Sequence, residues 1–433
     1  MKVSIFLLSL VFTIFSCNTS TDTSTSDTTL EITPDSLQYQ LQIPDEDILY
    51  DKVLGSLVGS AIGDAMGAPT EMWARQDRVL TYGHVEALDP SFIDPSPEGL
   101  WDFHLPKGAT TDDTRWKSLI GRYIVDHMSS FYRPTGPDPA TFASEILSAY
   151  QDEVQKLKEI SDTESKQLEY KIRRLTWLQE WAPVAEEFIN GDLEAYTRAL
   201  HRFYGGDLLC AGMLYAPVLG LPYPADPAGA YHAAYRLGIF DQGYARDITG
   251  LTAAMVSASM GLDATPESVM EVFRTVDPND YFRSRLFGRA AFKTLRSAQY
   301  ISHAARDSTQ CSENLPNSES VSDCRLQRAF LMLDEQNQRS PAHAQEILLV
   351  SLTAMLYCNF EFQSTMEFIT NYGRDNDTSG AVVGAVLGAY HGFEKLPNQI
   401  KLQVINTNRD HLGIDLEQLA ASITEEILKE KAS

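Results

Sequence analysis

The sequence predicts an all-α protein, and three observations favour that class. From about residue 47 onward, apolar residues recur at intervals of three and four, which is the spacing of a helix face. No convincing set of alternating apolar and polar residues, typical of strands, accompanies them. Of the 433 residues, 43% are hydrophobic and 22% are charged, which suffices for a core and excludes a disordered or collagen-like chain.

The N-terminus is typical of an exported protein. Lys2 precedes an unbroken apolar or small run that is too short to span a bilayer as a helix, so we expect a signal peptide at 1–16. Cys17 follows directly, and this junction resembles the lipidation signal of bacterial lipoproteins, with an ordinary signal peptide as the alternative. Residues 18–35 are almost all Ser, Thr, Asp or Asn, which suits a tether. We expect a lipid-anchored tether at 17–46 and a bacterial lipoprotein that faces the periplasm or the cell exterior. Membrane contact is expected only through the anchor.

The rest of the chain, 47–433, is expected to form a single all-α domain. Its first helix has a periodic apolar face that includes Leu54, Leu57 and Ile62, and another helix begins after residue 110. Further periodic runs lie near 140–180, 226–238, 247–260, 283–304, 341–369, 378–391 and 414–430. Helical insertions are expected at about 140–200 and 305–325.

Two of these helices carry a glycine at every fourth residue. The repeats are Gly55, Gly59, Gly63 and Gly67 in the first helix and Gly380, Gly384, Gly388 and Gly392 in the other. A glycine in a helix interior costs about 1 kcal/mol relative to alanine, so such repeats indicate that another backbone approaches closely. We expect the two helices to cross near the centre of the molecule.

Export also affects how the cysteines are interpreted. Cys311 and Cys324 bracket a polar stretch without a helical period, and in an oxidising compartment we expect them to pair, with two free thiols as the alternative. Cys210 and Cys358 lie in apolar surroundings, where cysteine usually behaves as a small buried hydrophobe.

The charge balance disfavours nucleic acid as a partner. Lys plus Arg number 35 against 59 Asp plus Glu, a formal net charge of -24, and we find no compensating basic stripe. An acidic excess suits divalent cations if the carboxylates are clustered.

One acidic cluster opens the helix that follows residue 110. Thr111, Asp112, Asp113 and Thr114 stand at its start, where Thr and Asp commonly accept hydrogen bonds from free amides. A simple helix cap is therefore the structural alternative to a functional site.

A second acidic cluster opens the glycine-repeat helix near the C-terminus. The run Asp375 to Gly380 is similar to the start of an EF-hand calcium loop. That loop needs a Glu at its twelfth position, which here is Val386, so an EF-hand is excluded.

Together the two clusters predict a metal centre. Four carboxylates brought near one another repel strongly unless they are protonated or bridged by cations. Asp and Thr oxygens suit a pair of hard divalent ions. Zinc is disfavoured, because neither cluster has a His or Cys beside it. We expect two Mg²⁺ ions, with Mn²⁺ or Ca²⁺ as substitutes.

These motifs resemble those of the ADP-ribosylglycohydrolase family, which includes dinitrogenase-reductase-activating glycohydrolases. The string Gly55–Glu71 looks like the family's opening helix, and 111–114 and 375–378 resemble its two metal motifs. The resemblance implies an orthogonal multi-helix bundle with two magnesium ions in a central cleft and removal of ADP-ribose from proteins or related conjugates. By that resemblance the metal ligands would be Thr111, Asp112, Asp113, Asp375, Asp377 and Thr378.

The residues are also consistent with glycoside cleavage. Glu71 matches an acidic residue that in some family members lies at the scissile bond, which makes it the candidate base. Asp112 or Asp377 is the alternative base, and an exposed Glu just past a helix end is the structural alternative for Glu71. Nearby carboxylates would stabilise the oxocarbenium-like transition state.

The middle of the chain departs from the family pattern. The segments 205–213 and 240–247 differ from the family's sequences there, and the resemblance implies that they line the substrate cleft. Asp207 and Asp241 are candidates to bind sugar hydroxyls. Alternatively, Asp207 caps the next helix and Asp247 pairs with Arg246.

The leading hypothesis is therefore a magnesium-dependent hydrolase of an ADP-ribosyl or related ribosyl bond, acting on a small molecule or an ADP-ribosylated protein. One alternative is a hydrolase of a different N-glycoside or nucleoside. Another is a non-catalytic lipoprotein that binds a nucleotide or glycan. The motifs of serine hydrolases, zinc proteases and phosphate-binding or dinucleotide-binding loops are not found in the sequence. The sequence predicts no oligomeric state.

Overall fold

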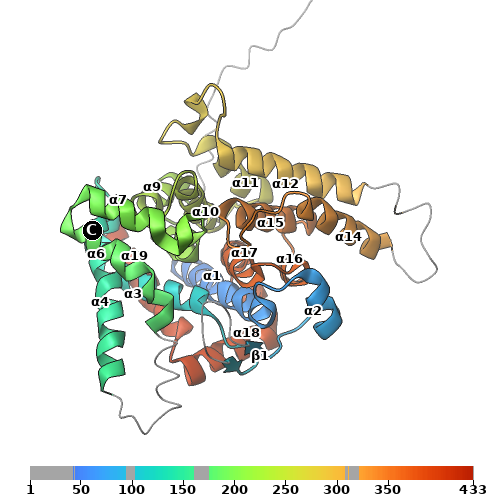
Figure 1. Cartoon of the computed structure of the whole chain (residues 1–433), viewed down its shortest axis with the longest axis horizontal. Coiled ribbons are helices and arrows are strands. Elements are labelled where there is room, and N and C mark those ends of the chain that lie inside the picture. Colours follow the sequence, from blue (N-terminus) through green and yellow to red (C-terminus); the bar gives the residue numbers. More distant parts are fainter. Residues whose placement is uncertain are drawn as a thin grey trace, which may run out of the picture. The chain divides into compact units, whose positions relative to one another are not determined.

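Helices dominate the computed structural model, which describes residues 42, 44–93, 103–159, 175–307, 311 and 321–432 (Figure 1). This confirms the all-α class. The predicted signal peptide, Cys17 and nearly all of the tether lie outside the described residues. Among the helices that are described, none combines the length and apolar character needed to cross a membrane.

The described elements are given in chain order. The helices are α1 (Glu46–Gly67), α2 (Arg75–Tyr82), α3 (Asp112–Phe131), α4 (Pro139–Lys158), α6 (Trp181–Asn190), α7 (Leu193–Arg202), α8 (Ala216–Gly220), α9 (Pro227–Leu237), α10 (Ala245–Ser259), α11 (Pro266–Thr275), α12 (Ala290–Arg306), α14 (Val321–Asp334), α15 (Ala344–Tyr357), α16 (Phe362–Tyr372), α17 (Asn376–His391), α18 (Asn398–Thr407) and α19 (Leu416–Ala432). Three 3-10 turns matter below: η1 (Ala68–Thr70), η2 (Phe203–Gly206) and η3 (Ala211–Leu214). A short antiparallel pair that the sequence did not indicate joins β1 (Ser91–Ile93) to β2 (Phe103–Leu105).

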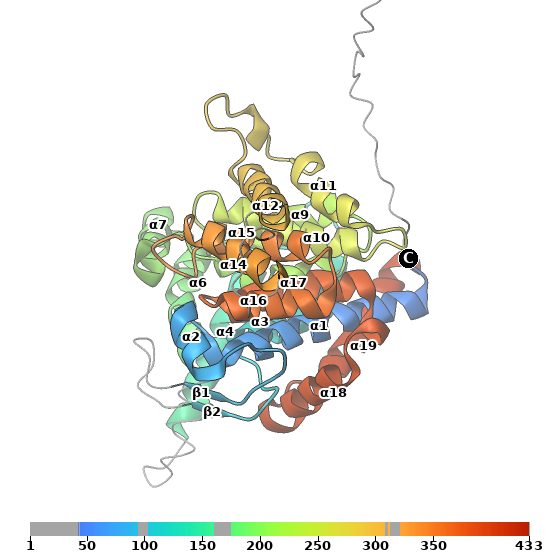
Figure 2. The same ribbon diagram turned by 90° about the vertical axis from the view of Figure 1, so that its right-hand side faces the viewer.

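The two glycine-repeat helices, α1 and α17, lie side by side in the middle of the fold (Figure 2). Gly55 faces Gly388 and Gly63 faces Gly380, so the helices are antiparallel and in contact over several turns. A Cβ added at Gly384 would lie 2.0 Å from the carbonyl oxygen of Gly59. The predicted close approach of backbones is confirmed, although the helices run alongside each other instead of crossing.

The core is built around this pair. Helices α3, α16, α18 and α19 pack against one or both of α1 and α17, and α10 and α15 cover another side of α17. Most side chains of α1 and α17 are buried, and their apolar residues do not gather on one face. A helix that is apolar all round is buried on all sides, as these two are.

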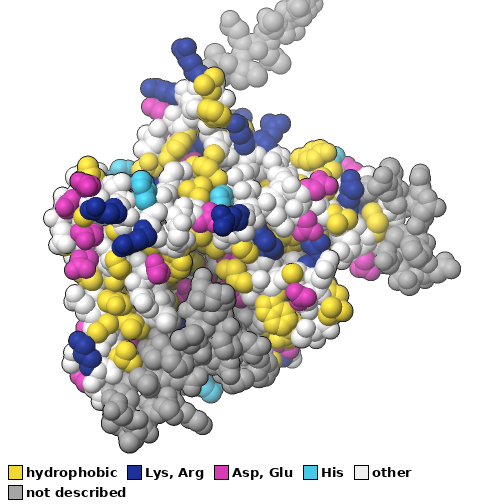
Figure 3. Space-filling model, in the orientation of Figure 1, with side chains coloured by type: hydrophobic (Ala, Val, Ile, Leu, Met, Phe, Trp, Pro, Cys, Tyr) yellow, Lys and Arg dark blue, Asp and Glu magenta, His cyan; other side chains and the backbone are white. Residues whose placement is uncertain are grey.

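Two periodic runs in the sequence are shorter in the structure than the pattern indicated. The run 283–304 becomes α12, which begins only at Ala290 and follows a projecting loop (Figures 1 and 3). The run 341–369 divides into α15 and α16, because Asn359 and Phe360 adopt left-handed φ values of 52° and 62°. Left-handed backbone cannot continue a right-handed helix.

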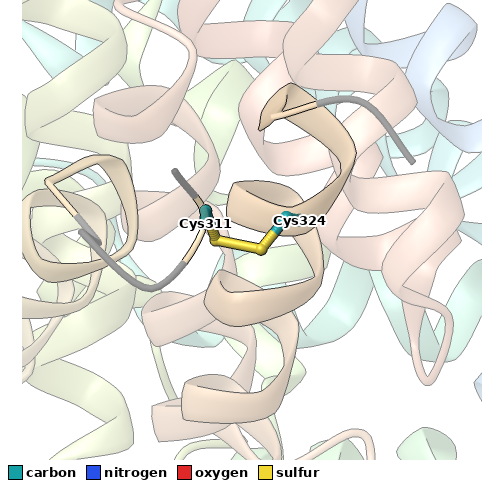
Figure 4. Close-up of a disulfide and its surroundings, with 2 residues drawn as sticks. All are labelled: Cys311 and Cys324. Carbon is teal, nitrogen blue, oxygen red and sulfur yellow. A yellow bond between two sulfur atoms is a disulfide. The ribbon is translucent and has the colours of Figure 1, made fainter. Parts of the chain in front are cut away.

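The predicted pairing of Cys311 with Cys324 is observed as a disulfide (Figure 4). It ties Cys311 to helix α14, and residues 312–320, the polar stretch before that helix, lie outside the described ones. Cys210 is buried and Cys358 is partly buried, and both are free thiols.

Replacing Gly384 with alanine should destabilise the fold. The added methyl group collides with backbone of α1, which cannot move aside as a side chain can. We expect Gly384→Ala to lower the free energy of unfolding by about 2 kcal/mol or more in urea denaturation, despite the better helix propensity of alanine.

Gly121→Ala in α3 is the matched control. There the added methyl group meets only the end of the Leu419 side chain, at 2.9 Å, which a rotamer change relieves. Equal stability of the two variants would contradict the proposed backbone contact.

Candidate functional site

The two acidic clusters meet where the N-termini of α3 and α17 lie together. Thr111 caps α3, and its hydroxyl donates to Oδ2 of Asp377 at 3.2 Å. In return, the hydroxyl of Thr378 donates to Oδ2 of Asp113 at 3.1 Å. Segments more than 260 residues apart thus form one site through a reciprocal pair of Thr–Asp hydrogen bonds.

Asp64 forms the floor of this site. It projects from α1 next to Gly63, and its carboxylate accepts hydrogen bonds from the amides of Thr111 (2.8 Å) and Thr114 (3.0 Å). The Thr114 hydroxyl adds a third, at 2.6 Å. Asp64 therefore holds the first turn of α3 against α1, and it also satisfies amides that have no partner within a helix.

The site concentrates buried negative charge. Asp64, Asp113, Asp375 and Asp377 are all buried, and Lys117 supplies a buried cation, 3.0 Å from Asp113. Burial, and then the charge of Asp113, raises the pKa of Asp64 and of Asp375 to about 7. Burial raises the pKa of Asp377 well above its ordinary value, with Glu71 the next largest cause.

Asp377 has an oxygen that the fold leaves unsatisfied. No hydroxyl, amide or cationic donor of the described residues reaches its Oδ1, although the atom is buried. In the described part of the chain, no group of three or more Asp, Glu, His or Cys side chains has an arrangement that could hold a metal ion as it stands. The carboxylates of Asp113 and Asp377 instead accept the hydroxyls of Thr378 and Thr111.

A backbone bridge brings Glu71 to the same end of the site. Glu71 follows η1, and the next residues pair with Arg374: Met72 N donates to Arg374 O at 2.8 Å, and Arg374 N donates to Trp73 O at 3.1 Å. Met72 and Arg374 both have left-handed backbone, with φ of 61° and 66°, which is costly for residues with a Cβ. Two hydrogen bonds from the Arg374 guanidinium to Glu346 on α15 (2.6 and 2.8 Å) hold the bridge in place.

Glu71 and Asp112 are the partly exposed members of the predicted site. The Glu71 charge acts on Asp377, and the Asp112 charge is among those that raise the pKa of Asp375, after burial and Asp113. These two carboxylates thus lie at the outer side of the cluster, within electrostatic range of the buried acids. Their roles as base and ligand stay predictions.

Asp241 is buried beneath the segment that leads to η3. It accepts the amide of Gly212 at 2.8 Å, and burial raises its pKa to about 6. A Cβ at Gly212 would lie 2.3 Å from both Asp241 Oδ2 and Thr249 Oγ1, so only glycine fits there. The observed position gives Asp241 a structural task, and its proposed contact with substrate stays a prediction.

Asp207 is half-buried, and its carboxylate accepts the adjacent Leu208 amide at 2.9 Å. It does not cap the next helix, because η3 begins four residues later. The suggested pairing of Asp247 with Arg246 is wrong, since Asp247 pairs with the buried Arg289 at 2.6 Å.

An open hollow of about 920 Å³ lies along α7. None of its lining residues belongs to the acidic cluster, and the last of them, Gly205, is two residues before Asp207. It is lined by Leu193, Glu194, Thr197, Arg198, His201, Arg202 and Gly205. Its basic side chains give it a character opposite to that of the cluster.

Asp64 and Lys117 are site residues that the sequence reasoning did not assign. Asp64 had a signal, because it is the one charged residue between Lys52 and Glu71. Lys117 had a weaker one, as a cation one turn after Asp113 on the same helix.

The helical fold and the joined acidic helix N-termini define an all-α protein with a buried carboxylate site. The model of the ADP-ribosylglycohydrolase family matches residues 45–432, and the chain therefore belongs to that family. The family acts on ADP-ribose-type substrates, and membership supports a glycosidase activity for this chain.

The solved structures support the same fold. One that matches is described as an "ADP-ribosylglycohydrolase-related protein complex", with a TM-score of 0.52 and 18% identity, covering 88% of this chain and 99% of that one. No curated protein sequence matches the chain.

Removing the Asp64 carboxylate should destabilise the junction of α1 and α3. Asp64→Ala leaves two buried amides and a hydroxyl without their acceptor, so we expect a loss of about 2 kcal/mol or more in the free energy of unfolding. Ser60→Ala, one turn earlier on α1, removes a buried hydroxyl that has no partner and should change stability little. A similar small effect for both variants would refute the role of Asp64.

The raised pKa values predict how stability depends on pH when chelator keeps divalent ions away. Asp64 and Asp375 have a pKa of about 7 in the folded protein against an ordinary 3.8, so the folded state binds more protons between these values. The free energy of unfolding should therefore fall as pH rises from about 4 to 7. Asp375→Asn should flatten this slope in denaturant titrations, and an unchanged slope would contradict the assignment.

Proposed function

We propose that this chain is a magnesium-dependent hydrolase of an ADP-ribosyl or related ribosyl glycosidic bond. The observation that carries the proposal is the convergence of two acidic helix N-termini, joined by the Thr111–Asp377 and Thr378–Asp113 hydrogen bonds. Family membership supports the reaction class.

The chemistry of the donor set favours hard divalent cations. The cluster offers carboxylate and hydroxyl oxygens, and the four buried carboxylates are accompanied by the buried cation Lys117, which pairs with Asp113. The unsatisfied Oδ1 of Asp377 fits the same need for positive charge. Two Mg²⁺ ions, or Mn²⁺ or Ca²⁺ in their place, would be held by Thr111, Asp112, Asp113, Asp375, Asp377 and Thr378.

Loading would require the two Thr–Asp hydrogen bonds to open, which frees oxygens on both sides of the junction. When bound, the ions supply positive charge that orients sugar hydroxyls and promotes ionisation of water. Because the pKa values of Asp375 and Asp377 are raised, cations would have to displace protons from these acids, so loading should release protons and strengthen as pH rises.

The residues of the chain supply the remaining steps of the proposal. Glu71, partly exposed at the outer side of the cluster, would take the proton of the attacking water, with Asp112 or Asp377 as the alternative base. The anionic cluster would stabilise the positive charge that develops on the ribose ring. The backbone bridge to Arg374 would hold Glu71 at a fixed position relative to Asp375.

A different glycoside, such as a nucleoside, is the second candidate substrate. Asp241, a predicted sugar-binding residue, accepts the Gly212 amide, and its contact with substrate stays a prediction. We also propose that the domain is exported and anchored through a lipid on Cys17, on the basis of the sequence before the folded part.

The test is release of free ADP-ribose from an ADP-ribosylated protein and from O-acetyl-ADP-ribose, with magnesium and with chelator. We expect activity when magnesium is present and none with chelator. Glu71→Gln should lower kcat about 100-fold, and Asp377→Ala should show no response to magnesium. Glu361→Gln is the matched control, because that carboxylate caps the exposed N-terminus of another helix, α16. Circular dichroism confirms that each variant is folded.

A parallel screen of nucleosides and sugar conjugates distinguishes the two substrate classes. Turnover of a nucleoside but of no ADP-ribosyl conjugate would select the second candidate. If no ribosyl compound is hydrolysed with any of the three metals, the proposed reaction is wrong, and tight binding without turnover would indicate a binding protein.

A further inference from the structure

The loop between α11 and α12 forms a surface that is basic and apolar, unlike the acidic cluster. We call residues 277–289 the tip. At the tip, Leu286 is 87% exposed, Phe287 is 70% exposed and Phe282 is 40% exposed. Two adjacent large apolar side chains with this exposure are unusual on a soluble surface, where such residues are mostly isolated.

The tip is held outward by its own hydrogen bonds. At its base, the buried Arg289 binds Asp247 and also donates to the carbonyl oxygens of Phe273 (3.0 Å) and Val276 (2.7 Å). At its other end, the carboxylate of Asp277 accepts the amides of two tip residues at 2.9 and 3.0 Å. The exposure of the apolar pair therefore follows from an ordered loop whose base is fixed.

Positive charge surrounds these apolar residues. From Tyr281 to Arg306 the chain has six Lys or Arg residues and no Asp or Glu, although its net charge is -24. Arg283 and Arg285 precede the apolar pair and are exposed, and Lys293 and Arg296 are exposed on α12. Figure 3 shows basic and hydrophobic side chains gathered over this loop.

Few acids oppose this charge. Asp280 pairs with Arg283 at 3.2 Å, and Asp277 is engaged with tip amides. On α11, Glu271 pairs with Arg274. Arg283 and Arg289 are thus paired with acids, and the exposed Arg285, Lys293 and Arg296 supply the remaining positive charge of this surface.

We propose that the tip docks on an anionic lipid surface. Leu286 and Phe287 would enter the boundary between headgroups and acyl chains, while Arg283 and Arg285 would contact lipid phosphates. Charge complementarity favours this partner, because the rest of this acidic chain is repelled by a negative membrane and the tip is attracted to it.

The place where the chain enters the folded part is compatible with this contact. Gln42 exchanges hydrogen bonds with Leu262 and Asp263, in the turn that precedes α11, and α11 leads to the tip. The docking proposal does not require the lipid anchor.

The test measures binding of the chain 17–433, with Cys17→Ser, to vesicles. This form contains the whole folded unit and carries neither signal peptide nor lipid. Vesicles of equal parts phosphatidylglycerol and phosphatidylcholine are compared with pure phosphatidylcholine by co-sedimentation. We expect binding to the anionic vesicles only, weakened by added salt.

Two tip variants and one control separate this docking from other causes. Leu286→Ser with Phe287→Ser, and Arg283→Gln with Arg285→Gln, should each weaken binding about 10-fold or more. The control, Leu80→Ser with Leu193→Ser, removes two apolar residues that are 85% and 76% exposed on other helices, and it should bind as the parent does. Equal thermal midpoints show that all forms are folded.

The proposal is overturned by absence of binding to anionic vesicles, by equal binding to both kinds of vesicle, or by equal losses in the tip variants and the control. Concentration-dependent self-association through the tip, without vesicle binding, would also overturn it. Hydrolysis of a soluble substrate should not change in the tip variants, which keeps this test independent of the proposed reaction.

Discussion

The contact between the backbones of α1 and α17 is the constraint on which the site depends. The glycine repeats let the two helices approach until a methyl group would overlap the facing carbonyl oxygens. That approach places Asp64 on one helix and Asp377 on the other at a single junction, to which α3 adds Thr111 and Asp113. A larger separation would leave the acids of the three helices too far apart to influence one another.

The close approach of the helices also brings buried carboxylates together, where their charges repel one another. Burial and mutual repulsion favour the protonated acids, as the raised pKa values of Asp64, Asp375 and Asp377 indicate. Cations would relieve this repulsion without moving the backbones. The tip has the opposite design, with positive charge and apolar side chains in full contact with solvent. The domain thus combines a buried acidic cluster with an exposed loop that carries basic and apolar side chains.

The sequence predicted those parts of the fold and site that depend on a local residue pattern. Four glycines in register indicated a close backbone, and two Asp–Thr clusters at helix starts indicated that those starts would meet, as they do. Asp64 was missed because its partners, 47 and 50 residues away, are set by tertiary packing alone. The break between α15 and α16 was missed because Asn359 and Phe360 are not glycines, although both adopt left-handed backbone. The tip was missed because its apolar residues continue the helical spacing of the run 283–304. Gly288, with a left-handed φ of 62°, stops α12 from extending into that segment.

The bridge between Trp73 and Arg374 has a mechanical consequence. It ties the peptide that carries Glu71 to the residue just before Asp375, and the Arg374 guanidinium fastens both to Glu346 on α15. A displacement of α15 would therefore carry the glutamate and the aspartate together and preserve the spacing between them. Sequence changes on α15 would then shift Glu71 and Asp375 as one unit and leave the distance between their carboxylates unchanged.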